Sequence, residues 1–278
     1  MDNIQRMAML SKILKKEAKT IGFVPTMGYF HDGHLSLIKT AKQHMDVAVV
    51  SIFVNPKQFS HNEDLDKYPR DLKRDEEMAR LAGADVLFHP SLSDMYPDGY
   101  ATYVNVEGLA DTLCGGARPG HFKGVATVVT KLFGIVKPDI AYFGQKDAQQ
   151  SIIIKKMVQD LNMDIDIKVL PTVREKDGLA MSSRNMYLSE KERKDALCLN
   201  QALIKAEAAV KSGERDAVKI IKMIEGIIKE RPGAKIDYIE AVDTKTLNPV
   251  DRIVGETLVA LAVFIGNTRL IDNTILNP

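Results

Sequence analysis

Hydrophobic and polar positions follow two different periods along the first two-thirds of the chain. Continuous apolar runs typical of strands buried on both faces lie at 20–26, 46–55, 84–90 and 139–144. Stretches with helical spacing follow them at 34–44, 71–82, 121–136 and 146–161. A further strand is expected at 165–173, and 101–106 is typical of another. This alternation predicts a parallel sheet covered on both faces, a Rossmann-like doubly wound α/β fold.

The pattern changes near residue 175. Ser189 followed by Glu192 is a capping box that predicts the start of a helix, and a second helix is expected between Gly213 and Arg231. Strand-like runs then follow at 236–243, 258–266 and 268–276. Helices followed by neighbouring strands predict a smaller C-terminal α+β domain. The expected domains are therefore 1–174 and 175–278.

Composition narrows the class of protein without naming a chemistry. Lys and Arg together number 38 against 37 Asp and Glu, so no basic excess points to a nucleic-acid partner. The two cysteines, Cys114 and Cys198, have no metal-site spacing and fit a reducing compartment. The longest apolar run, 47–54, is too short to cross a bilayer. We expect a cytoplasmic protein with neither nucleic acid nor membrane as a partner.

Two histidines directly after the first predicted strand are the strongest candidates for chemistry. His31 and His34 lie in the stretch PTMGYFHDGH, which opens a predicted helix. No nearby cluster of carboxylates or cysteines completes a metal site, and a polar turn is an unusual place for core residues. A helix start directs backbone N–H groups and positive dipole toward one spot, which suits phosphate. A plain connecting loop remains the alternative at this point.

Several further motifs accompany this stretch in a fixed order along essentially the whole chain. They are VSIFVNPKQF, YPR, RPGHFKGVATVV, FGQKDAQQ and PTVREKDGLAMSSRN. Together with the HxGH signature they closely resemble the pantoate–β-alanine ligase family of the HxGH nucleotidyltransferase superfamily. The resemblance implies an ATP-dependent ligase that joins pantoate to β-alanine through a pantoyl-adenylate and releases AMP and diphosphate. It also implies Mg²⁺, a Rossmann-like N-terminal domain for ATP and pantoate, a smaller C-terminal lid domain, and a homodimer.

The resemblance also implies roles for individual residues. His34 takes the catalytic histidine position, with His31, Lys146 and Arg184 also acting on the phosphates. The implied ATP-binding residues are Pro25, Thr26, Met27, His31, His34, Gly144, Lys146, Asp147, Val173, Met181, Ser182, Ser183 and Arg184. A mobile lysine suits an anion that changes shape, and the guanidinium fork suits diphosphate. Gln145 stands where relatives often carry Glu, a variation we expect to be tolerated.

Substrate-binding positions follow from the same resemblance. Those implied for pantoate and β-alanine are Gln58, Gln150, Asn55, Tyr68 and Arg118. Neutral amides can hold the hydroxyls and carboxylate of pantoate without neutralising the nucleophile. Asp75 matches an acidic position associated with Mg²⁺, although its charged helix is more typical of a solvated face.

Three other functions compete with the ligase. A different HxGH nucleotidyltransferase acting on a phosphorylated acceptor calls for more cationic groups on the acceptor side than neutral Gln58 and Gln150 provide. An aminoacyl-tRNA synthetase calls for an anticodon domain or a basic RNA surface. A non-catalytic nucleotide-binding module needs no HxGH, GQKD and SSRN together. Release of AMP and diphosphate with pantoate separates these possibilities.

Overall fold

The computed structural model describes residues 1–59 and 65–278, and its contacts divide the chain into two compact units. Unit 1 comprises Met1–Asp111, Gly115–Gln145 and Gln149–Pro171. Unit 2 comprises Thr172–Pro278 together with two short segments, Thr112–Cys114 and Lys146–Ala148. A surface or structural role is expected for His61, and this residue lies outside the described part of the chain.

Unit 1 is built on a parallel five-stranded sheet. Its strands are β1 (Ile21–Thr26), β2 (Val47–Ile52), β3 (Val86–Phe88), β4 (Ile140–Gly144) and β5 (Asp166–Leu170). Their spatial order is β3-β2-β1-β4-β5, with parallel pairing at every recorded register. The chain order reverses between β1 and β4, and ligands of doubly wound sheets bind beyond the carboxyl ends of strands at such a point. The predicted fold class is confirmed.

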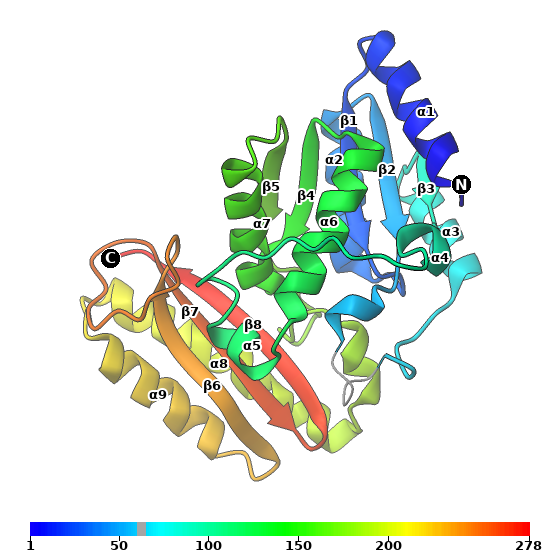
Figure 1. Ribbon diagram of the computed structural model, residues 1–278. Helices are drawn as coiled ribbons and strands as arrows, with labels where there is room; N and C mark the ends of the chain where they lie inside the picture. Colours follow the sequence, from blue (N-terminus) through cyan, green and yellow to red (C-terminus); the bar gives the residue numbers. More distant parts are fainter. Residues whose placement is uncertain (60–64) are drawn as a thin grey trace. The chain divides into compact units, whose positions relative to one another are not determined.

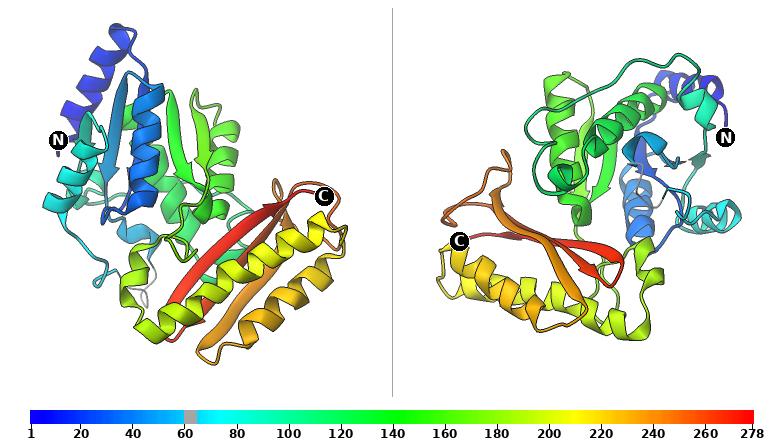
Figure 2. Two further views of the ribbon diagram at one scale, coloured as in Figure 1. Left: turned by 180° about the vertical axis from the view of Figure 1, so that it is seen from behind. Right: turned by 60° about the horizontal axis from the view of Figure 1, so that its bottom comes forward.

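The helices of unit 1 cover both faces of this sheet. The helical elements up to residue 160 are α1 (Ile4–Lys16), α2 (Asp32–His44), η1 (Pro56–Gln58), α3 (Leu72–Leu81), α4 (Leu92–Met95), α5 (Leu113–Ala117), α6 (His121–Val136), η2 (Gln145–Asp147) and α7 (Ala148–Asp160). Helix α6 packs on β1 and on α1 on one face (Figure 1). Helix α2 contacts β1, β2 and β4 and lies on the opposite face, as Figure 2 shows from behind. No helix in the described part of the chain is both long and apolar enough to span a membrane.

The strand predicted at 101–106 is absent from the described structure, so that prediction was wrong. The segment has no regular secondary structure, and the Val104 N–H donates to Thr127 Oγ1 on α6 at 2.9 Å. A side-chain hydroxyl of a helix therefore accepts from this backbone where a neighbouring strand was expected.

Unit 2 packs two helices on an antiparallel sheet. Its strands are β6 (Ala234–Asp243), β7 (Thr257–Ile265) and β8 (Thr268–Leu276), with β7 in the centre. Helices α8 (Glu190–Lys211) and α9 (Ala217–Lys229) cover one face, and η3 (Ser183–Tyr187) precedes them (Figure 2). Leu199, Ile224 and Leu261 belong to their shared core.

The capping box that predicted the first helix of unit 2 is present. The Glu192 carboxylate accepts from the Ser189 N–H at 2.9 Å, and the Ser189 hydroxyl accepts from the Glu192 N–H at 3.3 Å. Each side chain thus satisfies a backbone donor that the helix itself leaves without a partner. The smaller α+β unit predicted from this pattern is confirmed.

Candidate active site

The turn after β1 has an unusual backbone. Gly28 and Tyr29 both adopt positive φ angles, of 84° and 53°. The Thr26 hydroxyl accepts from the Gly28 N–H at 3.1 Å and donates to the Ser51 carbonyl at 2.7 Å, which ties the turn to the end of β2. A Cβ at residue 28 would lie 2.9 Å from Asp75 Oδ2. Glycine is therefore required at 28 both by the backbone angle and by the close approach of a carboxylate.

Asp75 holds this turn in place and is almost fully buried, with 1% of its surface exposed. Its two carboxylate oxygens accept from the N–H groups of Tyr29 at 2.6 Å and Phe30 at 2.7 Å. Burial raises the pKa of this carboxyl group, and the two N–H donors oppose that shift. The neighbouring Arg74 donates to the Phe30 carbonyl at 2.9 Å. The solvated helix face expected for Asp75 is therefore wrong, because consecutive N–H groups of the turn form an anion nest that this side chain fills.

Both candidate histidines sit at the start of α2. His31 occupies the N-cap position, and the two imidazole rings lie against each other with centroids 4.2 Å apart and planes tilted by 36°. His34 Nδ1 accepts from the His31 N–H at a long 3.4 Å. Because Nδ1 is an acceptor, the neutral His34 ring carries its proton on Nε2, where it can be donated. Both side chains are half-buried, and the helix start adds positive dipole beside them.

A second polar cluster lies in unit 1 around η1. Gln58 is buried, and its Nε2 donates toward Met27 Sδ at 3.0 Å, so the amide points toward the turn that follows β1. Asn55 is 0% exposed, and its Nδ2 donates to Gln58 Oε1 and to the Gly124 carbonyl, each at 3.1 Å. A Cβ on residue 124 would meet the Lys57 carbonyl at 2.2 Å, so glycine lets η1 pack directly on α6.

Arg118 is connected to this cluster through a residue that the sequence analysis did not single out. His121, the first residue of α6, has its Nδ1 2.8 Å from the Gln58 carbonyl oxygen, which can only accept, so Nδ1 carries the proton. Arg118 then donates to His121 Nε2 at 3.2 Å and to the Gln58 carbonyl at 3.4 Å. The signal that could have found His121 is its place in RPGHF, directly after a left-handed Gly120.

Tyr68 and Gln150 are the remaining candidate substrate-binding residues of unit 1. Tyr68 is buried, with its ring edge-on to Phe59 at 6.1 Å. Gln150 is half-buried in the first turn of α7, whereas Gln149 is buried and donates to the Leu109 carbonyl at 3.0 Å. The structure therefore leaves Gln150, and not its neighbour, facing partly outward.

Lys146 and Asp147 belong to unit 2. The Lys146 amine lies 3.6 Å from Asp147 Oδ1, and the Asn273 side chain donates to the Lys146 carbonyl at 2.9 Å. This bond attaches the backbone of η2 to β8, while the lysine amine lies beside Asp147. A Cβ on Gly144 would meet open space among the described residues, so no contact within them requires glycine there.

The MSSRN segment of unit 2 is held at its base. The Val173 carbonyl accepts from the Met181 N–H at 3.0 Å, and Arg174 pairs with buried Asp272 through two contacts of 2.6 and 3.0 Å. The Ser182 hydroxyl accepts from the Arg184 N–H at 3.3 Å and so caps η3. No sequence pattern connects Arg174 with Asp272, because the two residues lie 98 positions apart.

Two groups of predicted residues are thus assembled, each within its own unit. Pro25, Thr26, Met27, His31, His34, Gln58 and Asn55 form the group in unit 1, with Tyr68, Arg118, Gly144 and Gln150 in the same unit. Lys146, Asp147, Val173, Met181, Ser182, Ser183 and Arg184 belong to unit 2. The first group offers imidazole, amide and helix-start donors, and the second offers a primary amine, hydroxyls and a guanidinium.

The described residues offer little for a metal ion held by the protein itself. Among the described residues, no group of three or more His, Cys, Asp or Glu side chains is placed to hold one. Both oxygens of Asp75 already accept backbone hydrogen bonds, so this carboxylate fits a direct magnesium ligand poorly.

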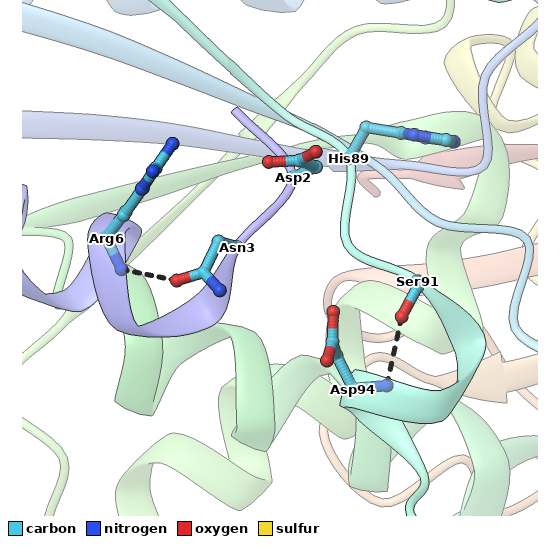
Figure 3. Close-up of a pocket in the computed structure, with 6 residues that line it drawn as sticks. All are labelled: Asp2, Asn3, Arg6, His89, Ser91 and Asp94. Atoms are coloured by element: carbon cyan, nitrogen blue, oxygen red, sulfur yellow. Dashed lines mark hydrogen bonds between the residues drawn. The ribbon is translucent and has the colours of Figure 1, made fainter.

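An open hollow of about 480 Å³ lies elsewhere in unit 1 (Figure 3). Its lining residues are Asp2, Asn3, Arg6, His89, Ser91 and Asp94. Asn3 and Ser91 are helix caps that accept from the N–H groups of Arg6 and Asp94, at 2.9 and 3.1 Å. Two of its polar side chains therefore serve local helix ends, and none of the predicted site residues lines it.

Comparisons with known proteins identify the family of this chain. The family described as pantoate-beta-alanine ligase matches residues 1–275. A pantothenate synthetase of Acetivibrio thermocellus is 58% identical over 274 residues, covering 99% of this chain and 98% of that protein. The crystal structure of pantothenate synthetase from Thermus thermophilus superposes with a TM-score of 0.94 at 41% identity, covering 100% and 99% of the two chains.

A further solved structure carries ligands. The pantoate-beta-alanine ligase of Francisella tularensis, described as complexed with beta-gamma ATP and beta-alanine, has a TM-score of 0.82 at 38% identity. The match covers 99% of this chain and 96% of that one. The chain therefore belongs to the pantoate–β-alanine ligase family, as the ordered motifs of its sequence predicted.

Proposed function

We propose that this enzyme carries out the family reaction in two steps at the residues described above. The carboxylate of pantoate first attacks the α-phosphorus of ATP, giving pantoyl-adenylate and diphosphate. The amine of β-alanine then attacks the activated carbonyl, giving pantothenate and AMP. A carboxylate oxygen is a poor leaving group, and adenylation makes it part of AMP, which leaves readily.

The observation that carries this proposal is the turn after β1. His31 and His34 stand together at the N-terminus of α2, next to the point where the strand order reverses. The Nε2–H of His34 can donate to a phosphate oxygen as negative charge grows there, aided by the helix dipole. No covalent nucleophile is needed, since positioning and charge stabilisation suffice for this transfer.

The other predicted residues divide the remaining work. Gln58 and Gln150 hold pantoate through neutral amides, with Tyr68 and Arg118 as further contacts. Lys146 and Arg184 neutralise the phosphates, assisted by the hydroxyls of Ser182 and Ser183. Pro25, Thr26, Met27, Gly144, Asp147, Val173 and Met181 complete the nucleotide site.

Magnesium enters this proposal as a companion of ATP. The donor set at Asp75 does not suit a protein-held ion, so we assign Mg²⁺ to the nucleotide phosphates and Asp75 to the turn. The resemblance also supports a cytoplasmic homodimer, which size-exclusion chromatography with light scattering would test.

The deciding experiment measures AMP and diphosphate with pantoate and ATP, with and without β-alanine. We expect AMP to require both substrates, and diphosphate to appear with pantoate alone in a single turnover. If pantoate fails to elicit diphosphate, the ligase proposal is refuted. Diphosphate release with a phosphorylated acceptor in its place would identify the other HxGH nucleotidyltransferase reaction.

A further inference from the structure

Tyr96, which follows α4, connects to the substrate amides through a chain of hydrogen bonds. Its hydroxyl donates to Asn55 Oδ1 at 2.9 Å. Asn55 Nδ2 then donates to Gln58 Oε1 at 3.1 Å, and Gln58 Nε2 donates toward Met27 Sδ at 3.0 Å. All four residues belong to unit 1.

The direction of this chain is fixed by its partners. Asn55 Nδ2 also faces the Gly124 carbonyl, which can only accept, so the NH₂ must be on that side. Oδ1 then faces the Lys57 N–H at 3.2 Å and the Tyr96 hydroxyl. Because Gln58 Oε1 accepts from Asn55, the end of Gln58 nearest the turn after β1 is its NH₂ donor.

The ring of Tyr96 is held by aromatic neighbours, and its hydroxyl keeps its proton. Its ring packs edge-on to Tyr100 at 4.9 Å and lies 6.0 Å from the Phe53 ring. Burial raises its pKa, with smaller contributions from Tyr100 and Tyr103, so the hydroxyl remains a donor throughout the working pH range.

We propose that Tyr96 is a positioning residue for pantoate binding: together with the Gly124 carbonyl and the Lys57 N–H it holds Asn55, which in turn keeps the NH₂ of Gln58 turned toward the substrate. The inference rests on the proposed function, in which Gln58 contacts pantoate. The groups of pantoate that an amide NH₂ can recognise are acceptors, its carboxylate and hydroxyl oxygens. A reversed Gln58 would place a carbonyl oxygen against them, which repels a carboxylate.

The neighbouring Tyr100 provides a matched control. It belongs to the same aromatic cluster, and Lys131 Nζ lies 4.7 Å from the centre of its ring. Tyr100 is not among the recorded partners of Asn55 within the described residues. Replacing either tyrosine by phenylalanine removes a single oxygen, but only the change at 96 interrupts the chain to Gln58.

The test compares wild type, Tyr96→Phe and Tyr100→Phe by pantoate-dependent diphosphate release, with pantoate and ATP varied in turn. We expect Tyr96→Phe to raise the pantoate KM about five- to tenfold, the ratio expected for one net hydrogen bond. The ATP KM should stay within about twofold of wild type, because the nucleotide residues are untouched. Tyr100→Phe should match wild type in both constants.

A double mutant asks whether Tyr96 acts through Gln58. In a Gln58→Ala background, Tyr96→Phe should leave the pantoate KM unchanged, because the amide it orients is gone. The thermal unfolding midpoint of every variant is measured first, and all assays are run at temperatures below the lowest of these midpoints.

The inference alone would be overturned by an unchanged pantoate KM in Tyr96→Phe, or by an equal rise in both KM values. An independent, additive effect in the Gln58→Ala background would do the same. Absence of pantoate-dependent diphosphate from wild type would instead overturn the proposed function, and this inference with it.

Discussion

The two groups of candidate binding residues are held in place by different physical means. In unit 1, the turn after β1 is held by one carboxylate, Asp75, that is 1% exposed. In unit 2, the segment after β5 is held partly by Arg193, which contacts Glu175 at 2.6 Å and Asp177 at 2.7 Å with all three side chains about one-third exposed. The first arrangement is buried and the second is open to solvent.

This difference indicates which of the two groups of candidate residues keeps its geometry before substrates bind. Breaking the contacts of a buried charge leaves groups without partners and costs several kcal/mol, whereas exposed ion pairs contribute about 0–1 kcal/mol each. We therefore expect the imidazoles of unit 1 to keep one geometry, and the hydroxyls and guanidinium of unit 2 to adjust as phosphates arrive and leave. The predictions below test this contrast, beginning with the largest effect.

Replacing His34 by alanine should cause the largest loss. Removing one donor to a developing oxyanion typically lowers kcat about 10²–10³-fold, and His34→Ala removes such a donor. Single-turnover diphosphate release measures the step directly. His44→Ala, at the exposed end of the same helix, is the control and should retain wild-type rates. Near-normal diphosphate release by His34→Ala would refute the catalytic role of His34, and with it the contrast drawn between the two groups of candidate residues.

Asp75→Asn should come next. An asparagine can accept from one of the two N–H groups but turns its own NH₂ toward the other, so a buried donor loses its partner. We expect a loss of about 1–3 kcal/mol in unfolding free energy, with a roughly tenfold fall in the rate of diphosphate release. Urea unfolding and the release assay provide the two measurements. Glu76 is exposed on the same helix, so Glu76→Gln should change neither the unfolding free energy nor the release rate. An equal effect of both variants would contradict the role of Asp75 in holding the turn after β1.

Asp272→Asn tests the pair that buried Asp272 forms with Arg174 beside the second group. Asp272 is 2% exposed and Arg174 is 26% exposed, so solvent can partly replace the lost contact. We expect about 1–2 kcal/mol of destabilisation and a severalfold higher ATP KM, with the pantoate KM unchanged. Glu225→Gln, which breaks the exposed pair with Lys229, should leave both constants as they are. A changed pantoate KM in Asp272→Asn would show that the two groups are not separable.

The smallest effect concerns the capping box of α8 and acid. Hydrogen bonds from the backbone and hydroxyl of Ser189 lower the pKa of Glu192. An acid with a lowered folded pKa contributes stability that is present above its unfolded pKa, near 4.5, and lost as pH falls through the folded pKa. Glu192→Gln should therefore reduce the fall in thermal midpoint between pH 5 and lower values. An unchanged acid dependence would contradict this assignment.

The sequence predicted most of the fold because its cues are local. Buried strands read as continuous apolar runs, and Ser189 with Glu192 placed the start of α8. It also indicated the histidine pair and Gln58 through motifs in order. The same local cues gave the wrong structure at 101–106, where a side chain on α6 satisfies the backbone that a neighbouring strand was expected to pair.

The hydrogen-bond partners of the polar groups could be found only from the tertiary structure. Asp75 lies in a run of charged residues that looks solvated, yet the turn that it braces lies 45 residues earlier in the chain. Tyr96 is 41 residues from Asn55, and no period or motif connects them. Periodicity reports which face of an element is buried, because that depends on neighbours along the chain. Which donor meets which acceptor depends on how the strands are ordered in space, and that order is set by packing the whole sheet.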